Sequence, residues 1–271
     1  MTVVTEYEPS RAEAASPAVL ADTYEVAGAE HGRPIVFVHG TRESRTMWAP
    51  QQELADSYRI VTLDLPAHGV LGTQRFRLPS AVRHVADVID AAADGRALVV
   101  GFSLGGYLAM ELAARTPGRV AGLLLAGASS EPWIALASPL RLAARFVLAM
   151  DAGMPMPWAA ALAGRAALGT RLPDQPPSST TSRGPRIDAG GQALLEIAGR
   201  RFRPRLRAYP GPTLIVNGAR DPLMRRHELA FLGDCRIGRL AVVPGAAHVA
   251  SRDAPEAFNR LVRGFATTVP W

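Results

Sequence analysis

The chain has 271 residues, of which 48% are hydrophobic and 20% charged, and its net charge is +6. This composition is typical of a globular enzyme, and the length allows one large core with an inserted lid. No stretch of about 18 residues is both apolar and uncharged, and residues 1–16 are polar and acidic, so we expect neither a membrane span nor a signal peptide. The single cysteine, Cys235, excludes an internal disulfide, and no Cys or His cluster has metal-ligand spacing. We therefore expect a cytoplasmic protein without a metal or a cofactor.

Short apolar runs alternate with helical patterns along the chain. The runs that predict strands cover residues 35–38, 58–63, 97–100, 120–125, 213–216 and 240–243. Ser80 to Ala93 predicts an amphipathic helix with Ser80 as its N-cap, and Thr116-Pro117-Gly118 marks the end of the helix that follows strand 97–100. This alternation predicts an α/β fold with a mostly parallel sheet and helices on both faces, whose strands are buried on both sides.

Ser103 is the candidate nucleophile. It lies in Gly101-Phe102-Ser103-Leu104-Gly105, directly after the strand 97–100 and directly before a helical pattern that begins at Gly106. A strand, tight turn and helix are the context in which a G-x-S-x-G match indicates a nucleophile elbow. Glycines suit this turn because the following helix must pass close to the strand, with no room for a Cβ.

Asp221 and His248 are the candidate acid and base. Asp221 follows the strand 213–216, and His248 follows the strand 240–243. The carboxyl ends of parallel strands share one edge of a sheet, so these residues can meet Ser103 despite their separation in sequence. A serine hydroxyl needs a base that titrates near pH 7, and a carboxylate on the other ring nitrogen fixes the tautomer of that base. Asp221 can alternatively serve as a helix cap.

The strand 35–38 leads into His39-Gly40-Thr41. We expect this turn to fold back over the elbow, so that the backbone N–H groups of Thr41 and Leu104 form an oxyanion hole.

Together these segments resemble the α/β-hydrolase fold superfamily, in its serine-nucleophile branch with a helical cap. The resemblance covers about residues 20–130 and 206–271 and rests on the motifs 39–40, 64–69, 101–106, 217–221 and 245–248. It implies a serine esterase-like site with the roles given above, and it implies that His39 braces the oxyanion loop. Two positions depart from the common pattern: Ala67 stands where glycine is frequent, and Val70 where serine often follows His-Gly.

The chain is expected to divide into a core of residues 1–130 and 206–271 and a helical cap of residues 131–205. The cap lacks strand patterns and is rich in Ala, Leu, Met and Arg. Its large apolar side chains are candidates for lining a substrate pocket, or alternatively for packing the cap onto the core. These are Trp133, Met150, Met154, Met156 and Trp158. The composition of Pro173 to Arg186 predicts a mobile segment.

Positive charge is concentrated in residues 131–210, with a net charge of +6, and especially in Arg200–Arg207. A solvated cap face explains this run more simply than attraction of an acidic substrate, and nucleic-acid binding fits less well still. His68 is expected to be a scaffold residue of its turn. The remaining histidines, His31, His84 and His227, are expected at surface or helix positions.

The sequence therefore predicts a hydrolase that cleaves a carboxylic ester, thioester or lactone through an acyl-Ser103 intermediate, acting on a small molecule. Carbon–carbon hydrolases and perhydrolases of this fold share the triad, so the bond cleaved stays open. A lyase acting on an acidic substrate is a further alternative, against which Tyr107 stands where an arginine is common in such lyases. A receptor-like ligand-binding protein or an inactive scaffold would also keep these residues. The oligomeric state stays open.

Overall fold

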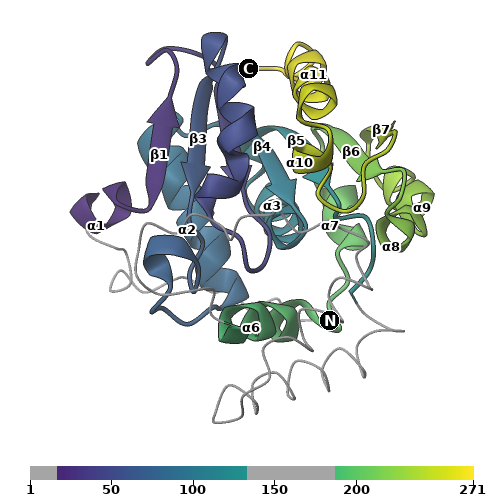
Figure 1. Cartoon of the computed structure of the whole chain (residues 1–271), viewed down its shortest axis with the longest axis horizontal. Coiled ribbons are helices and arrows are strands. Elements are labelled where there is room, and N and C mark those ends of the chain that lie inside the picture. The colour runs from purple at the N-terminus through teal and green to yellow at the C-terminus, as the bar shows by residue number, and fades with distance from the viewer. Residues whose placement is uncertain (1–16, 133–186) are drawn as a thin grey trace, which may run out of the picture.

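The computed structural model describes residues 17–132 and 187–271 (Figure 1). Its centre is a seven-stranded sheet, within the described residues, of order β1-β3-β2-β4-β5-β6-β7. β1 runs antiparallel to β3, and every other neighbouring pair is parallel. The strands are β1 (Tyr24–Ala27), β2 (Pro34–Val38), β3 (Arg59–Leu63), β4 (Ala97–Phe102), β5 (Val120–Ala126), β6 (Pro212–Gly218) and β7 (Ile237–Val243).

Helices cover both faces of the sheet, as the sequence predicted. The α-helices are α1 (Pro17–Ala21), α2 (Leu78–Ala92), α3 (Leu104–Arg115), α6 (Ile187–Ile197), α7 (Arg203–Ala208), α8 (Pro222–Arg225), α9 (Glu228–Leu232), α10 (Ala250–Asp253) and α11 (Pro255–Ala266). The 3-10 helices are η2 (Arg45–Asp56), η3 (Gly69–Leu71) and η4 (Pro117–Arg119). Within these ranges no helix has both the length and the apolar character needed to cross a bilayer.

Alternate side chains of each central strand enter two separate apolar cores. Val36 and Val38 of β2 pack in one core with α2, α3 and α7, whereas Ile35 and Phe37 pack in the other with η2, α10 and α11. All four side chains are fully buried. Because both faces of β2 are covered, its sequence is an unbroken apolar run rather than an alternating one.

The predicted N-cap of α2 is wrong. The helix begins at Leu78 with Arg77 as its N-cap, and Ser80 lies exposed in the first turn. The N–H of Leu78 donates to the Glu196 carboxylate of α6 at 3.2 Å. A distant side chain therefore satisfies the first turn of α2 in place of a local serine.

The two edge strands also differ from the sequence prediction. β1 had no predicted counterpart, and β7 begins three residues before the predicted run, at Ile237. The first three residues of β7 are exposed, so they carry no continuous apolar signal. The parallel strands end at one edge of the sheet, where Thr41, Ser103, Asp221 and His248 follow β2, β4, β6 and β7.

Candidate active site

Ser103 occupies a strained turn between β4 and α3. Its φ is +49° and its ψ is −113°, a conformation that side-chain-bearing residues rarely adopt. The Ser103 N–H donates to the carbonyl of Ala126 at 2.9 Å, and its own carbonyl accepts from Gly106 N–H at 3.0 Å. A Cβ on Gly105 would lie 2.2 Å from the carbonyl oxygen of Val38. Glycine at position 105 therefore lets α3 start directly against β2, which holds the serine at the tip of the turn.

The structure brings Ser103, His248 and Asp221 together. His248 Nε2 lies 3.3 Å from Ser103 Oγ, and His248 Nδ1 lies 2.6 Å from Asp221 Oδ2. Asp221 and His248 are 2% and 5% exposed, whereas Ser103 is half-buried. The other carboxylate oxygen of Asp221 accepts from the backbone N–H of Met224 at 3.1 Å. Asp221 therefore caps α8 and also contacts the imidazole, so the two interpretations of its sequence position are compatible.

The His248 loop is held from three sides. The N–H of Ala247 donates to the Asp253 carboxylate at 2.7 Å, which fixes the residue before the imidazole. The ring of Phe102 lies 5.1 Å from the imidazole, between ring centroids. Gly127, at φ +55°, also lies close to the imidazole: a Cβ on Gly127 would be 3.1 Å from Cε1 and Nδ1 of His248. The imidazole orientation is therefore set by packing as well as by Asp221.

Thr41 and Leu104, the two expected oxyanion donors, flank the residues that pack at the elbow. Gly40 lies against the elbow, because a Cβ there would be 3.4 Å from Ser103 Cβ. Leu104 is the first residue of α3, and the first N–H groups of a helix have no partner within it. Neither Thr41 N–H nor Leu104 N–H has a backbone hydrogen bond within the described ranges. These are the two donors that the sequence predicted for an oxyanion hole.

His39 sets the direction of the Gly40–Thr41 peptide. Its Nε2 lies 3.0 Å from the N–H of Leu65, which donates, so Nε2 carries no proton. Nδ1 therefore holds the hydrogen and donates it to the carbonyl of Gly40 at 2.8 Å. In a trans peptide the N–H of Thr41 points away from that carbonyl, and hence away from His39. Burial is the largest cause that lowers the pKa of His39 well below its usual value, which keeps the ring neutral.

Asp64 links the loops beside the expected oxyanion turn, a role that the sequence analysis did not assign. Its carboxylate accepts from Arg45 N–H at 2.8 Å and from Val70 N–H at 3.1 Å. His84 lies 3.0 Å from the Asp64 carbonyl, and burial lowers the His84 pKa. A carboxylate at the carboxyl end of a buried strand was the signal that could have identified Asp64. A similar signal, a carboxylate just past the strand 213–216, identified Asp221.

The arginine run around α7 faces acidic residues of the core. Arg203 and Arg207 both pair with Asp234, at 2.5 and 2.7 Å, and Arg205 pairs with Glu111 at 3.0 Å. Both carboxylates are largely buried, at 9% and 1% side-chain exposure. These three guanidinium groups therefore tie α7 to the core. Their side chains are also 36–59% exposed, so they keep the solvent contact that the sequence analysis expected.

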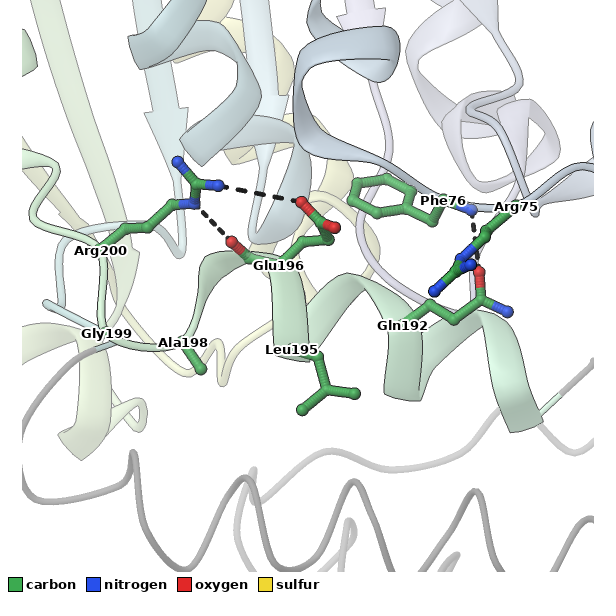
Figure 2. Close-up of a pocket in the computed structure, with 8 residues that line it drawn as sticks. All are labelled: Arg75, Phe76, Gln192, Leu195, Glu196, Ala198, Gly199 and Arg200. Carbon is green, nitrogen blue, oxygen red and sulfur yellow. Dashed lines mark hydrogen bonds and ion pairs between the residues drawn. The ribbon is translucent and has the colours of Figure 1, made fainter.

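Helix α6 lies at the carboxyl edge of the sheet (Figure 1). It borders a cavity of about 570 Å³ (Figure 2). The lining residues are Arg75, Phe76, Gln192, Leu195, Glu196, Ala198, Gly199 and Arg200. None of the three residues of the Ser103 site lines this cavity. The predicted pocket residues Trp133, Met150, Met154, Met156 and Trp158 lie outside the described residues, as does the segment 173–186. The division into core and cap stays a prediction.

Comparison with known proteins places this geometry in a family. The sequence profile of the alpha/beta hydrolase family matches residues 35–261. The chain is 28% identical over 258 residues to the pimeloyl-[acyl-carrier protein] methyl ester esterase of Edwardsiella ictaluri, covering 86% of this chain and 93% of that protein. It is also 28% identical over 250 residues to the dihydrolipoyllysine-residue acetyltransferase component of the acetoin cleaving system of Pseudomonas putida. That match covers 88% of this chain, which spans 64% of the length of that relative.

A solved structure shows the same fold. The thermophilic esterase from Thermogutta terrifontis superposes with a TM-score of 0.76 at 23% identity, covering 90% of this chain and 92% of that chain. Because the family profile spans most of the sequence, the chain belongs to the alpha/beta hydrolase family and is an enzyme of that fold, as its motifs predicted.

Proposed function

We propose that the protein hydrolyses a small carboxylic ester, with a thioester or lactone as chemically equivalent substrates. Ser103 is the nucleophile, His248 the general base and acid, and Asp221 the residue that orients the imidazole. The observation that carries the proposal is the continuous contact from Ser103 Oγ through both ring nitrogens of His248 to Asp221 Oδ2. Such a line of contacts activates an otherwise weak hydroxyl nucleophile.

Acylation follows from these contacts. Ser103 Oγ attacks the substrate carbonyl carbon while its proton passes to His248 Nε2, and the carbonyl oxygen takes up negative charge. The bond from carbon to the leaving oxygen then breaks, and His248 returns the proton to the leaving alcohol. The products of this half-reaction are the alcohol and an acyl-Ser103 ester.

Deacylation repeats the same proton transfers with water. His248 Nε2 takes a proton from the attacking water, the acyl–oxygen bond to Ser103 breaks, and the proton returns to Ser103 Oγ. The net reaction converts the ester and one water molecule into a carboxylic acid and an alcohol. The N–H groups of Thr41 and Leu104 stabilise the oxyanion in both halves, and the start of α3 adds favourable electrostatic potential there.

One of the named relatives supports an ester substrate, because the Edwardsiella ictaluri protein is a methyl ester esterase. The lyase alternative was motivated by excess arginine in the expected cap. Arg203, Arg205 and Arg207 pair with two carboxylates, those of Asp234 and Glu111, which offset part of the positive charge that suggested an acidic substrate. We therefore prefer ester hydrolysis.

The test is release of nitrophenolate from p-nitrophenyl acetate and p-nitrophenyl butyrate by wild type, Ser103→Ala and the exposed-serine control Ser80→Ala. We expect wild type and Ser80→Ala to turn over both esters and Ser103→Ala to be inactive. A fluorophosphonate probe should add one adduct to wild type and none to Ser103→Ala, as read by mass spectrometry. A folded wild type that is neither labelled nor active would overturn the proposal and favour a binding role.

A further inference from the structure

The side-chain hydroxyl of Thr41 is buried without a hydrogen-bond partner in the part of the chain that the structure describes. Leaving a buried hydroxyl unpaired is unfavourable, and such groups are rare in folded proteins. Gln51, Arg59 and Glu111 each also have one unpaired buried atom, but each of them uses another side-chain polar atom in a hydrogen bond. Thr41, Trp48 and Ser251 each have a single polar side-chain atom, and within the described residues that atom is unpaired in all three. Of these residues, Thr41 is the one that directly follows Gly40, which packs against Ser103.

Thr41 belongs to the loop that is expected to form the oxyanion hole. Thr41 directly follows Gly40, and a Cβ on Gly40 would lie 3.4 Å from Ser103 Cβ. The N–H of the same residue has no backbone hydrogen bond within the described residues. The Thr41 hydroxyl therefore belongs to the residue next to Gly40, whose backbone packs against Ser103.

Helix α6 covers the hydroxyl. A Cβ on Gly190 would lie 3.4 Å from Thr41 Oγ1 and 3.0 Å from Arg42 Cγ, so the helix backbone passes directly beside both residues. Gly190 itself is buried. A larger residue at position 190 would press on the loop that carries the hydroxyl.

Two side chains of α6 hold the helix in this place. Gln192 Oε1 accepts from Phe76 N–H at 2.9 Å, a contact drawn in Figure 2, and Glu196 Oε2 accepts from Leu78 N–H at 3.2 Å. The helix that shields Thr41 from water is thus anchored to the core at two points. Water exclusion strengthens any hydrogen bond that the hydroxyl makes to a developing charge.

We propose that the Thr41 hydroxyl is a third oxyanion donor, which hydrogen-bonds the substrate carbonyl oxygen as it becomes negative. The inference rests on the proposed function of Ser103. A hydroxyl rotates freely about its C–O bond and forms stronger hydrogen bonds to an anion than to a neutral carbonyl. Thr41 therefore stabilises the transition state more than the bound ester, and its loss affects kcat more than KM.

The test compares wild type with Thr41→Val, Thr41→Ser and the control Thr116→Val. Valine keeps the shape of threonine without the hydroxyl, whereas serine keeps the hydroxyl. We expect Thr41→Val to lower kcat for p-nitrophenyl butyrate by about 10- to 100-fold with KM nearly unchanged. Thr41→Ser should stay within a few-fold of wild type.

Stability measurements separate this role from a structural one. Thr41→Val removes an unpaired buried hydroxyl, so its midpoint of urea unfolding should equal or exceed that of wild type. Thr116→Val loses the bond from Thr116 Oγ1 to the Leu112 carbonyl, and should lower the midpoint while leaving kcat unchanged. Lower activity together with lower stability in both Thr41 variants would overturn the proposal.

Fluorophosphonate labelling distinguishes the two proposals. If wild type is labelled at Ser103 and active while Thr41→Val keeps full kcat, the Thr41 inference fails and the proposed function stands. If wild type is neither labelled nor active, the proposed function fails, and the Thr41 inference fails with it. Slower labelling of Thr41→Val than of wild type supports the inference, because the probe also places an oxygen in the oxyanion hole.

Discussion

Glu43 and Arg252 form an ion pair with two hydrogen bonds between the two loops of the site. Arg252 Nη1 and Nη2 lie 3.0 and 2.8 Å from the two carboxylate oxygens of Glu43. Glu43 lies two residues after Thr41, and Arg252 lies in α10, four residues after His248. The pair therefore connects the expected oxyanion loop to the loop that carries the imidazole. The side chains are 21% and 29% exposed, so solvent weakens the pair without removing it.

Breaking this pair should reduce activity through the positions of the two loops. We expect Glu43→Gln and Arg252→Gln each to lower kcat/KM for p-nitrophenyl butyrate by about two- to tenfold, with a coupling energy of about 0.5–1 kcal/mol in the double variant. A double-mutant cycle measures this coupling. Additive effects of the two substitutions would show that the pair does not align the site.

The buried His39 predicts a loss of stability at acidic pH. Its pKa in the folded protein is lowered, mainly by burial, so below about pH 6.5 the unfolded chain binds a proton that the folded chain does not. The contribution of the neutral, buried His39 to the free energy of unfolding is fully present above about pH 6.5. It falls by about 1.4 kcal/mol per pH unit below that, until the folded pKa is reached.

Urea unfolding of wild type and His39→Asn between pH 5 and 8 checks this prediction. Asparagine provides a donor and an acceptor but does not titrate, so its stability should fall less steeply toward pH 5 than that of wild type. His84 has a lowered pKa for the same main reason and contributes to both proteins alike. His31→Gln, at an exposed position, serves as the control for the removal of a surface histidine. Parallel slopes for wild type and His39→Asn would contradict the assignment.

Two substitutions of Asp221 should affect activity and stability differently. Asp221→Asn keeps an oxygen for the N–H of Met224 but loses the charge beside His248, so we expect kcat to fall by about 1,000- to 10,000-fold with little change in unfolding midpoint. Asp221→Ala loses both contacts and should also unfold at lower urea. An active Asp221→Asn enzyme would assign the residue to capping alone.

Gly105 should tolerate no side chain. A Cβ there would lie 2.2 Å from the Val38 carbonyl oxygen, a backbone atom that cannot move aside without shifting β2. We expect Gly105→Ala to lower the free energy of unfolding by about 1–3 kcal/mol and to reduce activity, as measured by urea unfolding and ester turnover. Gly118→Ala is the matched control, because nothing lies within 4 Å of its added Cβ.

Local sequence predicted those parts of the fold that have strong local signals. β2, β4 and β5 are buried on both faces, so each is an unbroken apolar run that follows directly from its environment. The edge strands β1 and β7 are largely exposed, and β7 was predicted only in part while β1 was not predicted at all. The cap of α2 was wrong because Glu196, 118 residues away from Leu78, supplies the acceptor.

By itself the sequence determined the family, the order of the central strands along the chain and the identity of Ser103, Asp221 and His248 as candidates, because each follows a strand or turn with a local pattern. Only the tertiary structure decided which groups that are far apart in the sequence contact one another. Examples are Arg205 with Glu111, Glu43 with Arg252, and the anchoring of α6 over Thr41. These contacts depend on the packing of segments that are far apart in sequence, and an exposed charge or a lone hydroxyl has no periodic pattern that reveals its partner.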